Sequence, residues 1–183
     1  MGLDVSAYKN IELVTTSDEE GEENDDLIYL HVGDFKEQAG DLVSGYYSYS
    51  ESDHFCRMGY GNYSNFRNEL AKLGGWNKRE LNKPDYYDPD FHNKNYYYNY
   101  PYVADIYMQD SDEVFGNFVE VICFSDCEGV IDSKTCDKLL KDFENKLAEA
   151  EIMWEDNPQY LKFYKGLMEA FRFGADKGVV IYG

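Results

Sequence analysis

The chain has 183 residues, of which 43% are hydrophobic, and this length is enough to bury most of the unfolded surface in a single domain spanning residues 1–183. Its formal net charge of −19 argues against direct nucleic-acid binding, because phosphate contacts need clustered Lys and Arg to release counterions. No apolar run reaches the roughly 20 residues of a membrane helix, and the residues after Met1 do not resemble a secretion signal.

The N-terminal third shows strand patterns on both sides of an acidic segment. Apolar and polar residues alternate over 3–8, which predicts a half-buried strand, and 11–14 either continues this strand or pairs back on it. Residues 18–26 hold seven acids in nine positions, which is typical of a solvated loop because like charges repel. The apolar segment 27–32 predicts a second strand, and 43–50 is expected to be irregular or an edge strand.

When the chain is divided into three blocks, only the middle block, residues 43–83, is net basic. Residues 43–83 carry 4 acids and 6 bases, whereas residues 1–42 carry 12 acids and 2 bases and residues 84–183 carry 20 acids and 9 bases. Gly- and Tyr-rich sequence lies between two arginines within this block. Because the local field decides binding inside a pocket, this block is where we first expect an anionic, planar ligand.

The same stretch predicts a strand, a turn and a helix in succession. We expect a short strand over 55–58 and a turn over 59–61, where glycine permits unusual backbone angles. Asn62 is then placed to cap a helix that ends at Gly74-Gly75. The apolar positions of this helix recur at three- and four-residue steps: Tyr63, Phe66, Leu70 and Leu73.

Residues 75–102 have no clear periodicity and predict a long irregular loop. The loop contains a tyrosine cluster over 96–100. Tyrosine combines an apolar ring with a polar tip, so the cluster can cover the core, form a subunit interface or stack on a ligand. The second alternative predicts a homo-oligomer.

The C-terminal half predicts strand, two long helices and strand. The apolar run 118–124 reads as the clearest strand of the chain. Asp132 or Ser133 caps a helix that runs through about residue 154, and Asn157-Pro158 starts a second helix that ends near Gly178. Residues 179–182 form the last strand. The expected fold class is α+β, a small mainly antiparallel sheet packed with about three helices.

Catalytic signatures are absent from the sequence, so we expect no enzyme, no cofactor and no metal site. Cys127 lies between Asp126 and Glu128, whose charges raise a thiol pKa and make it a poor nucleophile. The four cysteines and three histidines are too scattered for a zinc site. Asp126 and Glu128 either form an acid/base pair or contact a ligand, while Ser125 and Asp126 can instead fix the turn after the preceding strand.

The two arginines of the basic segment have two interpretations. Arg57 and Arg67 either pair with the many acids or clamp a phosphate in bidentate fashion. In the second case Tyr60 and Tyr63 stack on a base or hydrogen-bond its sugar and phosphate. The candidate ligand-binding residues are therefore Arg57, Tyr60, Tyr63, Arg67, Ser125 and Asp126.

Three stretches resemble a family of small bacteriophage and prophage proteins. They are Met1-Gly2-Leu3-Asp4-Val5-Ser6-Ala7-Tyr8, the turn Arg57-Met58-Gly59-Tyr60-Gly61-Asn62-Tyr63 that leads to Phe66-Arg67, and Phe124-Ser125-Asp126-Cys127-Glu128-Gly129-Val130-Ile131. The acidic and tyrosine-rich loops lie outside the resemblance. Such phages encode inhibitors of host defence, and the chain is similar to one class of these, the anti-CBASS sponges that bind cyclic dinucleotides such as cGAMP without cleaving them.

The resemblance implies a non-catalytic protein that sequesters a cyclic oligonucleotide immune signal in the cytoplasm of the infected bacterium, often as an oligomer. Two other hypotheses stay open. The acidic surface favours a DNA mimic or an inhibitor of a basic host protein, and the pair Asp126 and Glu128 favours a hydrolase.

Overall fold

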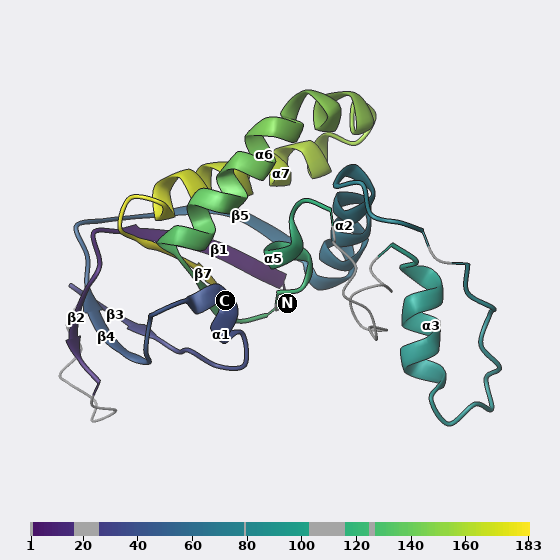
Figure 1. Ribbon diagram of the computed structural model, residues 1–183, viewed down its shortest axis with the longest axis horizontal. Helices are drawn as coiled ribbons and strands as arrows, with labels where there is room; N and C mark the ends of the chain where they lie inside the picture. The colour runs from purple at the N-terminus through teal and green to yellow at the C-terminus, as the bar shows by residue number, and fades with distance from the viewer. Residues whose placement is uncertain (1, 17–25, 79, 103–115, 125–126) are drawn as a thin grey trace.

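The computed structural model describes residues 2–16, 26–78, 80–102, 116–124 and 127–183. Figure 1 shows a sheet with helices above it, a smaller sheet at one end and the separate helix α3 (Phe91–Asn99) at the other. The strands are β1 (Gly2–Lys9), β2 (Glu12–Thr15), β3 (Leu27–Leu30), β4 (Gly45–Ser48), β5 (Glu51–Gly59), β6 (Gly129–Asp132) and β7 (Val179–Tyr182). The helices are α1 (Lys36–Ala39), α2 (Tyr60–Leu73), α3 (Phe91–Asn99), α5 (Val119–Ile122), α6 (Ser133–Met153) and α7 (Pro158–Gly174).

The main sheet has the strand order β5-β1-β7-β6, and every neighbouring pair is antiparallel. β1 is an inner strand, with Leu3 opposite Met58 of β5 and Val5 opposite Tyr182 of β7. Leu3 and Val5 are fully buried, whereas Asp4 between them is half-buried. The alternation that predicted this strand therefore separates an inner face from an outer face.

Long helices cover the inner face of the main sheet. α6 and α7 pack against each other, and α7 lies along β1 and β5. The aromatic side chains at the centre of this layer meet edge to face, with 4.9 Å between the rings of Phe118 and Phe143 and 5.9 Å between those of Tyr63 and Phe163. Burial of such rings supplies much of the apolar stabilisation of the domain.

The smaller sheet has the order β2-β4-β3 and covers part of the outer face. Leu30 of β3 and Tyr47 of β4 pack in one cluster with Val130 of β6 and Val179 of β7. The next residues along the main strands, Ile131 and Val180, belong to the helix-side cluster, so the two clusters lie on opposite faces. The predicted α+β class is confirmed, with α2, α6 and α7 as its three long helices.

The largest error of the sequence interpretation concerns residues 118–124, which were predicted as the clearest strand. Val119–Ile122 form the short helix α5, and Phe118 before it has a left-handed φ of 70°. Phe118, Val121 and Ile122 are all fully buried. A short apolar run that is buried on every side carries no periodicity, so the same pattern fits a strand and a helix turn equally well.

Strand pairing differs from expectation in the smaller sheet. Residues 12–15 neither continue β1 nor pair back on it, because Asn10 has a left-handed φ of 48° and the chain turns there to pair with β4. β4, expected to be irregular or at an edge, is the middle strand of that sheet. The strand predicted over 27–32 ends at Leu30, so His31 lies beyond it.

Two helix predictions also need correction. α2 begins at Tyr60, so Asn62 lies inside the helix instead of capping it, and the turn expected over 59–61 is the first helical turn. The loop expected over 75–102 contains α3, a helix of nine residues. The predicted end of α2 at Gly74 and the predicted limits of α6 and β7 are confirmed. The start of α7 at Pro158 is confirmed as well, but the helix ends at Gly174, four residues before the predicted end at Gly178.

The sequence left open whether Asp132 or Ser133 caps α6, and the structure assigns the cap to Asp132. Its carboxylate accepts a hydrogen bond from the backbone N–H of Thr135 at 2.8 Å. Replacing Asp132 by Ala is therefore expected to lower the free energy of unfolding by about 1 kcal/mol. Urea denaturation measures this change. Ser133→Ala is the matched control, and an equal loss in both variants would contradict the assignment.

Candidate functional site

Arg57 lies on the exposed outer face of β5. Its Nε atom is 3.5 Å from a carboxylate oxygen of Asp4, and His54 Nε2 is 3.9 Å from the other oxygen of the same carboxylate. The side chain of Arg57 is 66% exposed. Solvent-exposed ion pairs of this kind contribute about 0–1 kcal/mol, so Arg57 can exchange Asp4 for another anion at little cost.

The β5–α2 junction places the start of the helix directly after the strand. Gly59 is extended, with φ −63° and ψ 142°, and no side chain caps the N–H groups of the first turn of α2. Tyr60, the first helical residue, is half-buried and packs against the helix-side core.

Tyr63 and Arg67 point into the protein interior. Tyr63 is fully buried, and the guanidinium carbon of Arg67 lies 5.0 Å from the centre of its ring. Arg67 is 4% exposed and donates to the carbonyl oxygens of Phe124 at 3.0 Å and Ile122 at 3.5 Å. It also donates to the hydroxyl of Tyr96 in α3 at 3.4 Å. Arg67 therefore ties α5 and α3 to α2.

Of the four proposed site residues that the structure describes, it brings two into contact. Tyr63 and Arg67 are in contact inside the core, while Arg57 lies on the solvent-exposed outer face of the main sheet. Ser125 and Asp126 lie outside the described residues. Ligand binding by these residues remains a prediction, but a ligand would have to open the interior to reach Arg67.

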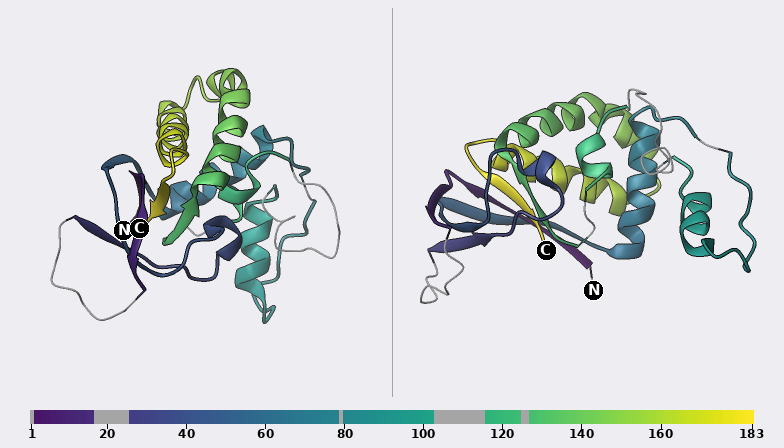
Figure 2. Two further views of the ribbon diagram at one scale, coloured as in Figure 1. Left: turned by 60° about the vertical axis from the view of Figure 1, so that its left-hand side comes forward. Right: turned by 60° about the horizontal axis from the view of Figure 1, so that its bottom comes forward.

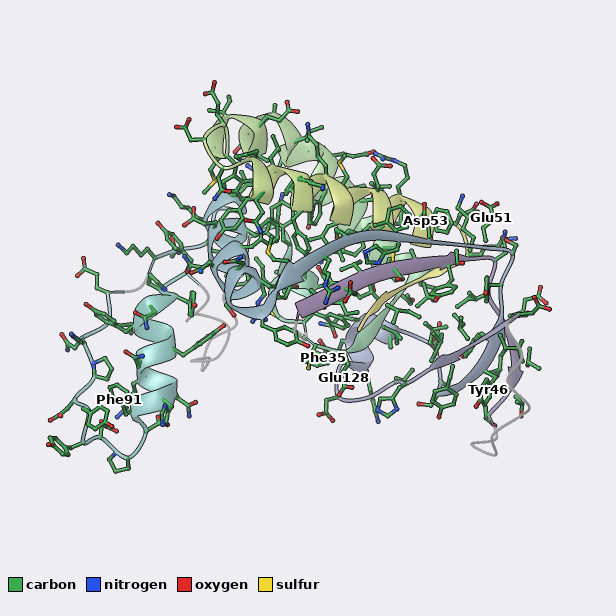
Figure 3. All side chains as sticks on the ribbon, turned by 180° about the vertical axis from the view of Figure 1, so that it is seen from behind. Phe35, Tyr46, Glu51, Asp53, Phe91 and Glu128 are labelled. Atoms are coloured by element: carbon green, nitrogen blue, oxygen red, sulfur yellow. The ribbon has the colours of Figure 1, made fainter. Side chains whose placement is uncertain are left out.

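A cavity of about 300 Å³ lies on the outer face, between the segment after β3 and the segment before and within β6. Figure 3 shows two of its residues, Phe35 and Glu128, next to each other. The polar lining comes from His31, Asp34, Cys127 and Glu128. The remaining lining residues are apolar or glycine: Val32, Gly33, Phe35, Ala39, Gly129 and Val130.

Backbone geometry explains how the wall of this cavity is formed. Gly129 has a φ of 145°, and a Cβ at this position would lie 2.6 Å from the ring of Phe124. Only glycine therefore lets β6 pass over that ring. Phe124 in turn contacts Phe35, with 5.0 Å between the ring centres. Phe124 does not line the cavity itself, but it supports two lining residues that are far apart in the sequence, Phe35 and Gly129.

The sequence interpretation missed the half of the cavity formed by residues 31–35. His31 was assigned to a sheet, whereas it is exposed and lies after the strand end. The signal that could have located it is Gly33 directly after an apolar strand, since glycine there marks a loop. The other half comes from residues 127–130, which directly follow in the sequence the two residues expected to form a second ligand wall.

Burial suppresses the reactivity of the described thiols away from the cavity. The pKa of Cys56 is raised to about 12 by burial and by the charge of Asp4. Burial, with the charge of Glu120, likewise raises the pKa of Cys123 to about 12. Such thiols stay protonated at neutral pH and are weak nucleophiles.

Among the residues that the structure describes, no cluster of three or more His, Cys, Asp or Glu side chains is placed to hold a metal ion. Within that same part of the chain, no helix combines the length and apolar character needed to span a membrane. Searches of protein-family models, of curated proteins and of solved structures found no match to this chain. The resemblance to phage proteins therefore remains a prediction.

The contacts of the two arginines predict a large loss of stability when Arg67 is replaced and a small one when Arg57 is replaced. Replacing Arg67 by Met removes the donor to two buried carbonyl groups and is expected to lower the free energy of unfolding by about 3 kcal/mol. The matched variant Arg57→Met is expected to change it by less than about 1 kcal/mol. Urea denaturation of both variants provides the comparison. Equal stability of the two variants would show that Arg67 does not hold α5 in place.

Proposed function

We propose that this chain is a non-catalytic binding protein that sequesters a cyclic oligonucleotide, with one base of the ligand in the cavity between residues 31–35 and 127–130. The observation that carries the proposal is the cavity itself. Its volume of about 300 Å³ lies at the lower end of the range of small-molecule pockets. A flat aromatic group fits this space, and a whole cyclic dinucleotide would extend beyond it.

The lining favours a base over a phosphate. Phe35 offers an aromatic surface, on which a stacked base gains about 1–3 kcal/mol by analogy with single-strand binders. The carboxylates of Asp34 and Glu128 accept hydrogen bonds, which suits the N–H groups on the edge of a base. The same carboxylates repel a phosphate, so the phosphates are expected outside the cavity.

Arg57 is suitably placed to meet such a phosphate. It stands opposite Asp4 in the sheet, and Asp4 exchanges two backbone hydrogen bonds with Gly183. On the other side of β7, Gly129 of β6 pairs with Tyr182. Because these strands are antiparallel, the residue before Gly129, which is Glu128, lies opposite Gly183. Arg57 and Glu128 are therefore three strand spacings apart on one face, about 14 Å. This separation is comparable with the dimensions of a cyclic dinucleotide.

The proposed biological setting follows from the resemblance. A phage protein that holds a cyclic oligonucleotide such as cGAMP in the cytoplasm of its host would lower the free signal and block anti-phage defence. A ligand larger than the cavity also gives a role to a homo-oligomer, in which a second copy would cover the exposed part. The protonated state of Cys56 and Cys123 supports binding without covalent chemistry.

Titration calorimetry with a panel of cyclic di- and trinucleotides tests the proposal. At least one member is expected to bind, and Phe35→Leu is expected to weaken binding about tenfold through loss of stacking. Tyr87→Leu is the matched control, because Tyr87 is 89% exposed, lies shortly before α3 and does not line the cavity. Absence of binding across the panel would refute the proposed function. Unchanged affinity in Phe35→Leu would refute the proposed cavity.

Heating the loaded protein separates binding from catalysis. A sequestering protein releases its ligand chemically intact, which liquid chromatography of the supernatant detects. Recovery of a linear or shortened nucleotide would contradict a non-catalytic role and favour the hydrolase hypothesis instead.

A second candidate function is supported by the distribution of charge. Lysines on α6 are largely paired already, as in Lys141 with Asp137 and Lys146 with Glu149. The net charge of −19 therefore leaves a surplus of carboxylates on the surface. This surface would suit a DNA mimic or an inhibitor of a basic host protein. Such a complex is expected to dissociate in high salt, because screening weakens exposed charge pairs.

A further inference from the structure

A second cavity lies beside α2, at the turn that joins α6 to α7. Its volume is about 360 Å³. Figure 1 and Figure 2 show this turn next to α2. Among the described residues, the cavity shares no lining residue with the one at residues 31–35. The lining residues are Asn65, Asn68, Glu69, Met153, Trp154, Asn157 and Tyr160. It is therefore independent of the function proposed above.

Three carboxamide groups give this cavity an unusual density of neutral hydrogen-bonding groups. The side-chain oxygen of Asn68 accepts a hydrogen bond from the backbone N–H of Tyr102 at 3.1 Å. The side-chain oxygen of Asn157 accepts one from the backbone N–H of Tyr160 at 3.4 Å. Within the described part of the chain, no bond engages the amide nitrogens of these two residues. Asn65 is exposed and makes no hydrogen bond there through its side chain.

Acceptors lie in the same cavity. The carboxylate of Glu69 is 3.8 Å from Lys72, which is too long for a hydrogen bond. Burial, with the charge of Glu69, raises the pKa of the Tyr160 hydroxyl, and both residues line the cavity. The Tyr160 hydroxyl consequently stays protonated and can both donate and accept.

Trp154 adds a buried donor. The residue is 3% exposed, and its indole nitrogen has no hydrogen-bond acceptor among the described residues. Buried donors in native proteins are normally satisfied by protein, water or ligand. The ring of Trp154 lies 6.1 Å from that of Tyr160 at an angle of 83°, so the cavity also has an aromatic wall.

This combination restricts the charge of a ligand. Glu69 and the absence of a cationic side chain from the lining disfavour an anion. A simple ammonium cation has only donors and cannot serve the amide nitrogens. A ligand that both donates and accepts at several adjacent atoms satisfies the whole set.

We propose that the cavity between α2 and the α6–α7 turn binds a neutral, hydroxyl-rich ligand of sugar size. Each hydroxyl donates and accepts through one atom, which matches the alternating oxygen and nitrogen atoms of the asparagines. The apolar C–H face of a sugar ring packs on Tyr160 and Trp154. Free saccharides and the ribose of a nucleoside share this chemistry, and the experiment below separates them.

The test is an NMR titration that follows the two indole N–H signals, one each from Trp76 and Trp154. The probes are glucose, N-acetylglucosamine and adenosine. At least one is expected to shift the Trp154 signal in a saturable manner. The Trp76 signal is the internal control, because this indole already donates to the carbonyl of Asn117 at 3.0 Å. A response to adenosine alone would assign the site to a nucleoside ribose.

Two variants show whether the shift reports the cavity. Asn65→Leu is expected to weaken binding at least tenfold without unfolding, since the side chain is exposed. Asn145→Leu is the matched control, an exposed asparagine of α6 outside the cavity. No shift of Trp154 with any hydroxyl-rich probe would overturn the proposal. Spermidine, inorganic phosphate and a dipeptide amide serve as comparison probes, and a shift of Trp154 produced only by one of these would also overturn the proposal. Equal binding by the two variants would overturn it as well.

Discussion

The buried guanidinium of Arg67 is the interaction on which the middle of the structure depends. A charge in the interior must have its donors satisfied, because an unpaired buried charge costs several kcal/mol. Arg67 meets this demand with the carbonyl oxygens of Ile122 and Phe124, and with the hydroxyl of Tyr96. The carbonyls at and just after the end of α5 therefore point to α2 and do not pair with any strand that the structure describes.

The same contact connects the core with the proposed ligand cavity. Arg67 holds the backbone of Phe124, whose ring lies under Gly129 and against Phe35. Two lining residues of the cavity, Phe35 and Gly129, thus rest on a ring that Arg67 helps to position from the interior. Arg67 acts as a positioning residue in this account, while Arg57 on the outer face is free to exchange its weak surface partner.

Local signals made the periodic elements predictable, and long-range contacts account for the failures. The alternation of β1 and the apolar faces and N-caps of α6 and α7 are local, so the existence and the starts of these elements followed from the sequence. Residues 118–124 are buried or half-buried throughout and are bonded to Arg67, more than fifty residues earlier in the chain, so no local pattern reveals their structure. The basic segment correctly drew attention to two arginines, but charge counting could not tell the exposed Arg57 from the buried Arg67. That difference is decided by tertiary packing.

The central claim is that ligand binds on the outer face of the sheet while Arg67 remains engaged in the interior. A crystal structure of the chain with a bound cyclic dinucleotide tests this most directly. The account predicts a base between Phe35 and Glu128, a phosphate near Arg57, and an intact bond from Arg67 to the Phe124 carbonyl. A ligand phosphate bound to the guanidinium of Arg67, with α5 displaced, would contradict it.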